Sequence, residues 1–176
     1  MARLDYVVEG SEIADRIRRR RGGQLTPLDG MLLHSPPVAD GWNSLLGAIR
    51  ERSTLPEDVR ELVILRVAEL NGADYEWAAH EPVARRSGLR AGQIAAAREG
   101  GDATALDDRQ RAALAYTDAM TRAVEVPQPV FAALHAHFDQ RQIVELTVTA
   151  GAYNLVSRFL VALQIGVEDQ EGGVCA

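Results

Sequence analysis

The amino-acid sequence predicts an all-α fold, a compact bundle of about six to eight helices. Hydrophobic residues make up 47% of the 176 residues, which is enough to build a core and far from the composition of disordered chains. Helix start and stop signals recur along the chain, and no run alternates between apolar and polar residues for long enough to predict a strand. The expected helices cover residues 38–52, 54–71, 74–87, 91–98, 107–122, 127–138 and 139–164.

The second of these helices has the clearest start signal. Thr54 can act as the N-cap, and Glu57, three residues later, completes a capping box. Pro56 fits the first turn, where its missing N–H costs nothing, and Gly72 is placed to end the helix. The centre of the segment, residues 62–65, is apolar on every side. We therefore expect this helix to be the central, buried one.

Other helix boundaries follow from the same chemistry. Gly88 is positioned as a left-handed C-cap for the preceding helix. Asp107 and Gln110 have the spacing of a second capping box, which would open the helix that follows them. Asp139 is expected to cap the last long helix.

The sequence divides into three parts. Residues 1–30 are expected to form an N-terminal arm, residues 31–165 the helical domain, and residues 166–176 a loose, acidic, glycine-containing tail. The arm carries a basic cluster made of Arg16, Arg18, Arg19, Arg20 and Arg21. This cluster is either the solvated end of a short helix or a contact for an anion or a partner, such as another subunit.

Two segments of the predicted domain resemble each other. Residues 60–65 and residues 143–148 share a Glu-Leu pair, and each segment precedes a tyrosine-containing stretch. Two copies of a helical hairpin, related by a pseudo-twofold axis, would explain this likeness. The similarity that any two buried helices share would explain it equally.

Charge and hydropathy exclude several classes of protein. A formal net charge of −6 argues against nucleic-acid binding, which requires a basic face. No stretch approaches the roughly 20 apolar residues of a membrane span. The N-terminal residues lack the apolar core of a signal peptide. We therefore expect a soluble, cytoplasmic protein that contacts neither nucleic acid nor membrane.

Two absences from the composition limit the chemistry further. The chain has one cysteine, Cys175, so it cannot form an intrachain disulfide, a C-x-x-C redox pair or a thiolate zinc cage. All 19 basic residues are arginine. Without lysine, Schiff-base catalysis, a pyridoxal phosphate anchor and a phosphate-loop lysine are excluded. No cofactor is expected.

The segment 61–80 carries the candidate site. Glu76 and His80 are four residues apart, so they lie on one face of a helix and can touch. Glu61 sits in an apolar run, where an unpaired charge is costly and a carboxylate usually has a partner or a function. The turn after residue 70 can bring Glu61 close to His80. Two carboxylates and an imidazole, lined by Tyr75 and Trp77, would suit proton transfer at a small organic molecule.

Purely structural roles for the same residues remain open. Glu76 and His80 also fit an ordinary surface pair, and Glu61 can be paired with Arg66 or with another arginine. Tyr75 and Trp77 can be core or interface residues.

A metal site is a minor alternative, because zinc or iron needs three convergent ligands and Glu61, Glu76 and His80 would have to supply them all. His135 and His137 point about 200° apart on a helix, so they cannot share a metal, and one is expected to face the core or an interface. His34 precedes a proline pair in a loop and is a weaker candidate for the pocket.

Residues 55–90 resemble the signature region of the carboxymuconolactone decarboxylase superfamily, which includes alkyl hydroperoxidase D (AhpD). The family pattern is a glutamate followed by C-x-x-C-x-x-x-H at the start of the next helix. Glu61 matches the glutamate and His80 the histidine, whereas Ala73 and Glu76 stand at the two cysteine positions. The likeness extends over residues 31–165, including segments 33–36, 41–42 and 151–160. It implies an all-helical fold that assembles as trimers or hexamers.

The resemblance also shows what this chain lacks. The peroxidase branch uses one thiolate to attack peroxide and a second to resolve the sulfenic acid, and Ala73 and Glu76 can do neither. Residual peroxidase activity through Cys175 would have no resolving thiol. The decarboxylase branch works without cysteines, by acid–base chemistry centred on a histidine. The segment Tyr75-Glu76-Trp77 does not match the motif of the true decarboxylase, so a substrate cannot be transferred.

Two functions follow as expectations. The first is a cofactor-free enzyme acting on a small organic acid or lactone, with His80 as general acid or base, Glu76 orienting it and Glu61 as a second proton carrier or hydrogen-bond partner. Tyr75 and Trp77 would line the pocket. The second is a non-catalytic binding protein that keeps the fold. In both cases we expect a homo-oligomer, a trimer or hexamer.

Overall fold

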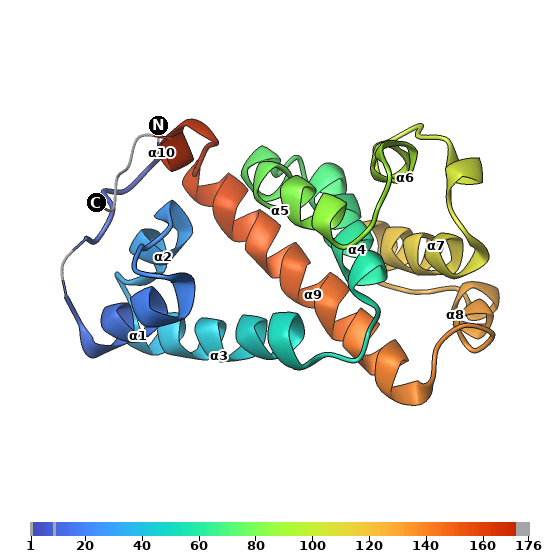
Figure 1. Ribbon diagram of the computed structural model, residues 1–176, viewed down its shortest axis with the longest axis horizontal. Helices are drawn as coiled ribbons and strands as arrows, with labels where there is room; N and C mark the ends of the chain where they lie inside the picture. Colours follow the sequence, from blue (N-terminus) through green and yellow to red (C-terminus); the bar gives the residue numbers. More distant parts are fainter. Residues whose placement is uncertain (1, 9, 172–176) are drawn as a thin grey trace. The chain divides into compact units, whose positions relative to one another are not determined.

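A computed structural model describes residues 2–8 and 10–171, and within these residues every regular element is helical (Figure 1). The elements in order are α1 (Glu12–Arg21), α2 (Pro27–Leu32), α3 (Pro36–Arg52), α4 (Glu57–Leu70), α5 (Asp74–Arg86), α6 (Ala91–Ala96), the 3-10 turn η1 (Ala103–Ala105), α7 (Asp108–Ala123), α8 (Gln128–Leu134), α9 (Gln140–Leu163) and α10 (Glu168–Glu171). The all-α prediction is confirmed. The chain divides into two compact units, one of residues 1–52 with 160–176 and one of residues 53–159.

Helix α4 is the buried centre of the unit 53–159. The four residues 62–65 are fully buried, which confirms the prediction from their unbroken apolar run. On one side α4 contributes Leu62 and Leu65 to a cluster with apolar residues of α5 and α6. On another side Val59 and Val63 pack with residues of α7, α8 and α9. A helix apolar on all sides is stable only when it is enclosed in this way.

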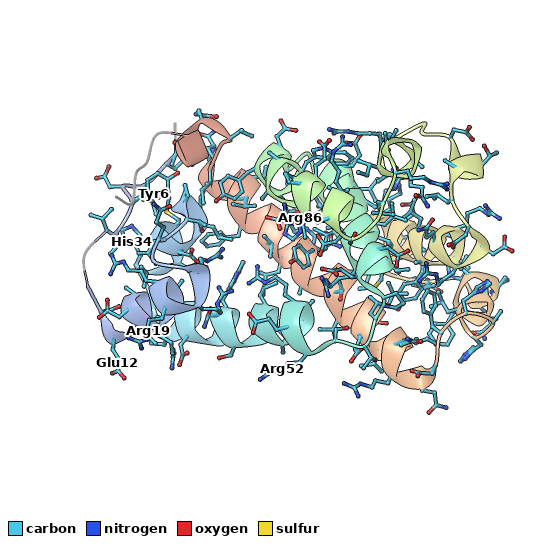
Figure 2. All side chains as sticks on the ribbon, viewed as in Figure 1. Tyr6, Glu12, Arg19, His34, Arg52 and Arg86 are labelled. Atoms are coloured by element: carbon cyan, nitrogen blue, oxygen red, sulfur yellow. The ribbon has the colours of Figure 1, made fainter. Side chains whose placement is uncertain are left out.

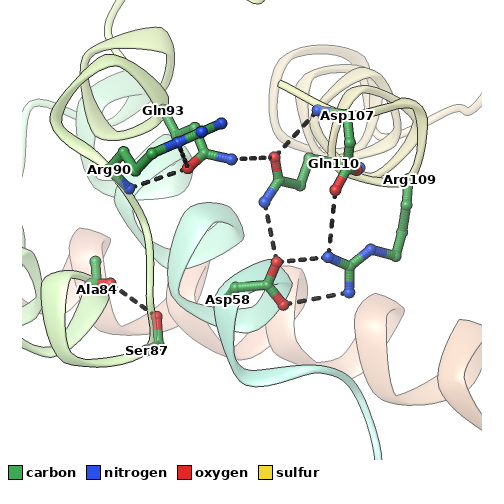
Figure 3. A network of polar contacts seen from close by, with 8 residues as sticks. All are labelled: Asp58, Ala84, Ser87, Arg90, Gln93, Asp107, Arg109 and Gln110. Atoms are coloured by element: carbon green, nitrogen blue, oxygen red, sulfur yellow. Dashed lines mark hydrogen bonds and ion pairs between the residues drawn. The ribbon is translucent and has the colours of Figure 1, made fainter. Parts of the chain in front are cut away.

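A chain of polar contacts holds α4, α6 and α7 together (Figure 3). Asp58 of α4 accepts from the Arg109 Nη2 at 2.6 Å and from the Gln110 Nε2 at 2.9 Å. Gln93 of α6 donates to the Gln110 Oε1 at 2.9 Å and accepts from the Arg90 backbone N–H at 3.0 Å. Gln93 and Gln110 are both buried, so these partners remove the cost of enclosing their amides.

Several predicted boundaries are confirmed by their caps. The Asp107 carboxylate accepts from the Gln110 N–H at 2.8 Å, and Gln110 accepts from the Asp107 N–H at 3.2 Å, which completes the capping box of α7. Asp139 likewise accepts from the Gln142 N–H at 2.8 Å at the start of α9. Gly88 has φ +96°, the left-handed conformation expected of a glycine that ends a helix.

The capping box predicted at the start of α4 is wrong. The helix begins at Glu57 with Pro56 as N-cap and no side-chain cap, and the Thr54 hydroxyl donates to the Glu145 Oε2 at 2.8 Å. The same oxygen accepts from the backbone N–H groups of Thr54 and Leu55 at 2.8 and 2.9 Å, and from the Ser53 hydroxyl at 3.0 Å. In a capping box the Thr54 N–H would donate to the Glu57 side chain, but it donates to the Glu145 carboxylate, so a tertiary contact replaces the local one.

The contacts of Glu145 keep its carboxylate ionised. Burial acts to raise the pKa of Glu145, but hydrogen bonds from Thr54, Arg141 and Ser53 outweigh it and lower this pKa to about 2. A carboxyl whose pKa is lower in the folded than in the unfolded chain stabilises the fold above the unfolded value of 4.5. That stabilisation is lost as the pH falls from there through the folded pKa.

The substitution Glu145→Gln should therefore lower the free energy of unfolding at pH 7 by about 1–3 kcal/mol, since it removes a charged acceptor from five donors. Denaturant melts of wild type and variant at pH 7 and pH 3 measure this loss, and the two proteins should differ less at pH 3. Glu99→Gln is a matched control, because Glu99 pairs with Arg122 in an exposed contact. Equal losses for the two variants would contradict the prediction.

The predicted arm and tail both contain helix, and α1 ends at the arginine cluster, as one of the two interpretations of the cluster predicted. The stretch 1–30, predicted as an arm, contains α1 and the start of α2, and the stretch predicted as a loose tail contains α10. Helix α8 stops at Leu134, four residues before its expected end at Phe138. The division into arm, domain and tail stays a prediction.

The arginine cluster of α1 is mostly engaged within its own unit. Arg16 pairs with Asp40, and the Arg21 Nε lies 2.7 Å from the Asp29 carboxylate. The Arg20 Nε donates to the Asn43 side chain at 2.8 Å. These contacts favour a structural role for the cluster.

Helix α9 is long and apolar enough to resemble a membrane span, contrary to the expectation that no segment does. Its 24 residues, with a mean hydropathy of 1.3 over the best window, would suffice for a span, and it is the one such helix among the described residues. Half of that window is buried inside the protein, as in the core helix of a globular domain. Length and composition alone are weak evidence for a membrane segment.

Candidate functional site

A tight turn between α4 and α5 brings the predicted site residues together. Gly72 has φ +62°, a left-handed conformation that allows the chain to reverse at this point. Asn71 stabilises the end of α4 by donating from its side-chain amide to the Val67 carbonyl at 2.9 Å. Helix α5 then returns along α4, so that a residue near the start of one helix faces a residue in the second turn of the other.

His80 lies between two carboxylates. Its Nδ1 is 2.7 Å from the Glu61 Oε2, and its Nε2 is 3.1 Å from the Glu76 Oε1. The three side chains are buried, with exposed fractions of 1% for Glu61, 4% for Glu76 and 8% for His80. Glu61, Glu76 and His80 therefore converge within hydrogen-bond distance, which sequence spacing alone does not decide.

The two carboxylates hold a proton on the imidazole. Burial acts to lower the pKa of His80, but the hydrogen bonds and charges of Glu61 and Glu76 outweigh it and raise this pKa to about 9. Burial acts to raise the pKa of Glu61, yet His80 and Arg60 together lower it. At neutral pH the site is an imidazolium held by carboxylate groups, with both ring nitrogens acting as donors.

Two residues that sequence reasoning missed complete the site. Arg60 donates from Nε to the Glu61 Oε1 at 3.1 Å, and the residue is itself buried, with an exposed fraction of 7%. Tyr153 of α9 places its ring against the His80 ring, with centroids 5.2 Å apart and planes at 88°. Arg60 is the sequence neighbour of Glu61, which is a usable signal. The only signal for Tyr153 is its position in a segment, 151–160, that resembles the family.

Arg66 is not the partner of Glu61. It forms a two-pronged ion pair with Asp118 of α7, at 2.6 and 2.7 Å, and donates to the Ala97 carbonyl at 3.1 Å. Glu61 and Arg66 are five residues apart and project from α4 about 140° apart. The prediction that some arginine pairs with Glu61 is nevertheless confirmed, because Arg60 does so.

The structure places Trp77 in a different environment from the one expected. Its ring packs in the apolar cluster with Leu62 and Leu65, and its Nε1 donates to the Glu81 carboxylate at 3.1 Å. The Arg98 guanidinium lies over the ring, 3.3 Å from its centroid. These contacts favour the alternative that Trp77 is a core residue, and its role in lining a pocket stays a prediction. Tyr75 is buried, and its expected role in the pocket stays a prediction.

The minor alternative of a metal site gains no support from the geometry. Within the described residues, no three His, Cys, Asp or Glu side chains are grouped so as to hold a metal ion. In the site itself both nitrogens of His80 already face carboxylate oxygens, so neither offers a lone pair to a cation.

The other histidines lie outside this arrangement. The His34 Nε2 is 2.7 Å from the Asp5 carbonyl oxygen, a contact within the unit 1–52 and 160–176 (Figure 2). His135 and His137 are both exposed, so neither faces the core of its own chain, and a place for one of them at an interface stays a prediction. Both residues follow α8, which ends at Leu134.

The sequence and the fold of the chain are similar to those of one group of helical proteins. Residues 36–119 match the sequence profile of the carboxymuconolactone decarboxylase family. A protein of unknown function from Agrobacterium tumefaciens, described as a putative antioxidant defence protein AhpD, is 26% identical, with a TM-score of 0.72 over 77% of this chain and 94% of its own. No curated protein matches.

Two further structures show the same fold at lower identity. The debrominase Bmp8, in complex with 2,3,4-tribromopyrrole, is 15% identical with a TM-score of 0.76 over 97% of each chain. An uncharacterised peroxidase-related protein from Silicibacter sp. TM1040 is 19% identical with a TM-score of 0.71, over 96% of this chain and 94% of its own.

Proposed function

Because the chain belongs to the carboxymuconolactone decarboxylase and AhpD-like superfamily, as a member without the C-x-x-C cysteines, we propose that it is a cofactor-free acid–base enzyme. Its substrate would be a small organic acid or lactone. The observation that carries this proposal is the buried His80 held between Glu61 and Glu76. A strongly shifted pKa in a buried histidine with two named charge partners is the usual mark of a group that moves protons.

His80 acts as the general acid in this proposal. Because its pKa is about 9, the imidazolium is the form present at neutral pH and has a proton to give. In a decarboxylation, the bond to the carboxylate carbon breaks, carbon dioxide leaves, and a proton must replace it on the electron-rich product. The His80 Nε2 would supply that proton, after the substrate displaces Glu76 from it.

The geometry favours an exchange of the roles expected for the two carboxylates. Glu61 makes the shorter contact, 2.7 Å against 3.1 Å, and is anchored by Arg60, so it is the better candidate for orienting the ring. Glu76 reaches His80 from the same helix through the longer contact, so it is the better candidate for returning the proton after turnover. The Tyr153 ring would keep the imidazole from rotating.

An assay of carbon dioxide release tests the proposal. The purified protein is incubated with 4-carboxymuconolactone and with a panel of β-keto acids and lactone acids, and turnover is compared with that of His80→Gln. Removing a general acid should lower kcat by about 10²- to 10⁴-fold. Glu69→Gln is the control and should retain the activity. Glu69 lies on the same helix as Glu61 but pairs with Arg98.

The alternative is a non-catalytic binding protein with the same fold, in which the buried ion cluster serves stability. It predicts that no member of the panel turns over, and that His80→Gln changes only the melting temperature. A two-cysteine peroxidase reaction is disfavoured by Ala73 and Glu76 at the cysteine positions. Cys175, the one thiol that could revive it, lies outside the described residues.

We also propose that the chain self-associates. Val144, Val148 and Leu155 of α9 are 61%, 40% and 50% exposed, and their spacing places them on one side of the helix. An exposed apolar stripe of this kind is typical of an interface. Light scattering at micromolar concentration should give the mass of a trimer or hexamer, whereas the 19.1 kDa of a single chain would contradict the proposal.

A further inference from the structure

A cavity lined by arginines and apolar side chains lies apart from the histidine site. It has a volume of about 350 Å³ and opens between α4, α7 and the segment that follows α6. Its lining includes three arginines, Arg66, Arg98 and Arg111. The backbone at Gly101 also borders it, where a Cβ atom would collide with the Ala95 carbonyl oxygen. None of the residues of the histidine site lines this cavity.

The walls of the cavity carry more positive than negative charge. Asp118 is the one carboxylate among the described lining residues, against three guanidinium groups. Glu69 and Asp108, which pair with Arg98 and Arg111, are not part of the lining. Each of these arginines has a carboxylate partner, but the partners of Arg98 and Arg111 lie outside the lining, so the wall itself presents more guanidinium than carboxylate groups to a molecule inside the cavity.

The arginines are held in place before any ligand enters. Arg66 is fixed by its ion pair with Asp118 and by the Ala97 carbonyl. Arg98 is stacked on Trp77, and Arg111 donates to the Leu106 carbonyl. Each guanidinium has five N–H donors, and these contacts leave some of them for a ligand. Pre-positioned donors reduce the side-chain entropy that binding would otherwise cost.

The remaining wall is apolar. Leu106 and Leu114 line the cavity, and both are less than a tenth exposed. A bare inorganic anion would leave this surface empty, whereas a neutral hydrocarbon would leave the guanidinium groups without an anion. Pockets of this size generally combine an apolar wall with a few polar groups that fix the orientation of the ligand.

We propose that this cavity binds a small organic carboxylate with an apolar body, such as an aromatic or medium-chain acid. The carboxylate pairs with the guanidinium groups, for which its planar geometry is suited, and the body lies against Leu106 and Leu114. The site is separate from His80, and the proposal does not depend on the enzymatic activity proposed above.

Calorimetric titration of the full chain with benzoate and with hexanoate tests the proposal. Saturable binding of at least one acid is expected, with benzyl alcohol and inorganic phosphate binding at least tenfold more weakly. Arg111→Gln should weaken binding of the acid about tenfold, since it removes one charge-assisted contact. Ala115→Glu, which places a carboxylate at an exposed lining position, should weaken it at least as much.

Two control variants show whether the acid binds in this cavity or elsewhere on the protein. Ala91→Glu makes the same charge change at an exposed helical position outside the cavity and should bind the acid as the wild type does. His80→Gln should also bind it unchanged. Circular dichroism melts verify that each variant is folded. The proposal is overturned if neither acid binds up to about 10 mM. It is equally overturned if phosphate or benzyl alcohol binds as well, or if His80→Gln loses binding while Ala115→Glu keeps it.

Discussion

The free energy of unfolding should fall as the pH rises from about 6.5 to about 9, by up to about 1.4 kcal/mol per pH unit. His80 titrates near 6.5 in the unfolded chain, and its pKa is raised to about 9 in the folded protein. Between these values the folded state binds a proton that the unfolded state has released. The stabilisation is complete below the unfolded pKa and is lost as the pH passes through the folded one.

Urea melts in half-unit steps from pH 6 to pH 9.5 measure this slope. His80→Gln should remove most of it, because glutamine keeps polar contacts with the carboxylates but does not titrate. His137→Gln, at an exposed histidine, is the matched control and should keep the wild-type slope. Parallel slopes for wild type and His80→Gln would show that Glu61 and Glu76 do not hold a proton on this ring.

The second large effect is expected from Glu61→Leu, which should cost about 3–5 kcal/mol of unfolding free energy at pH 7. The substitution leaves the buried Arg60 guanidinium and the His80 imidazolium without the carboxylate that contacts both. The free-energy cost of burying these two cations is then no longer offset by the negative charge of Glu61. Glu69→Leu, on the same helix, breaks a pair whose arginine is 46% exposed and should cost less than about 1 kcal/mol.

A double-mutant cycle isolates the contact between the two helices. Glu61→Leu with His80→Leu replaces both partners by apolar groups, so the double variant should be more stable than the sum of the two single losses predicts. Guanidinium melts of the four proteins at pH 7 give the coupling free energy. Strict additivity would mean that the 2.7 Å contact contributes nothing measurable to stability.

The parts of the structure that sequence reasoning predicted depend on local chemistry. The buried centre of α4, the caps at Asp107 and Asp139, and the left-handed Gly88 each follow from residues within a few positions of one another. The meeting of Glu76 with His80 belongs to this class, since it is an i, i+4 pair on one helix.

The failures involve partners that are far apart in the chain. Thr54 has every local feature of an N-cap, but a carboxylate 91 positions later accepts from both its backbone N–H and its hydroxyl. Tyr153 reaches His80 across 73 positions, and no spacing rule connects them. Trp77 packs in the apolar cluster with Leu62 and Leu65 of another helix, a contact that its spacing from His80 does not predict. Packing between helices determines these contacts, and no short segment of the sequence contains the information needed to predict it.

The contact of Glu145 with residues 53–55 has a consequence for the order in which the protein forms. On the ribosome, the residues that begin α4 emerge about 90 positions before Glu145 is made, so this junction must wait for most of the chain. The turn between α4 and α5, in contrast, can close as soon as both helices have emerged, because its contacts are local. The Glu61–His80 pair should therefore form early during synthesis. The contact between residues 53–55, which precede α4, and Glu145 should form late, after α9 has been synthesised.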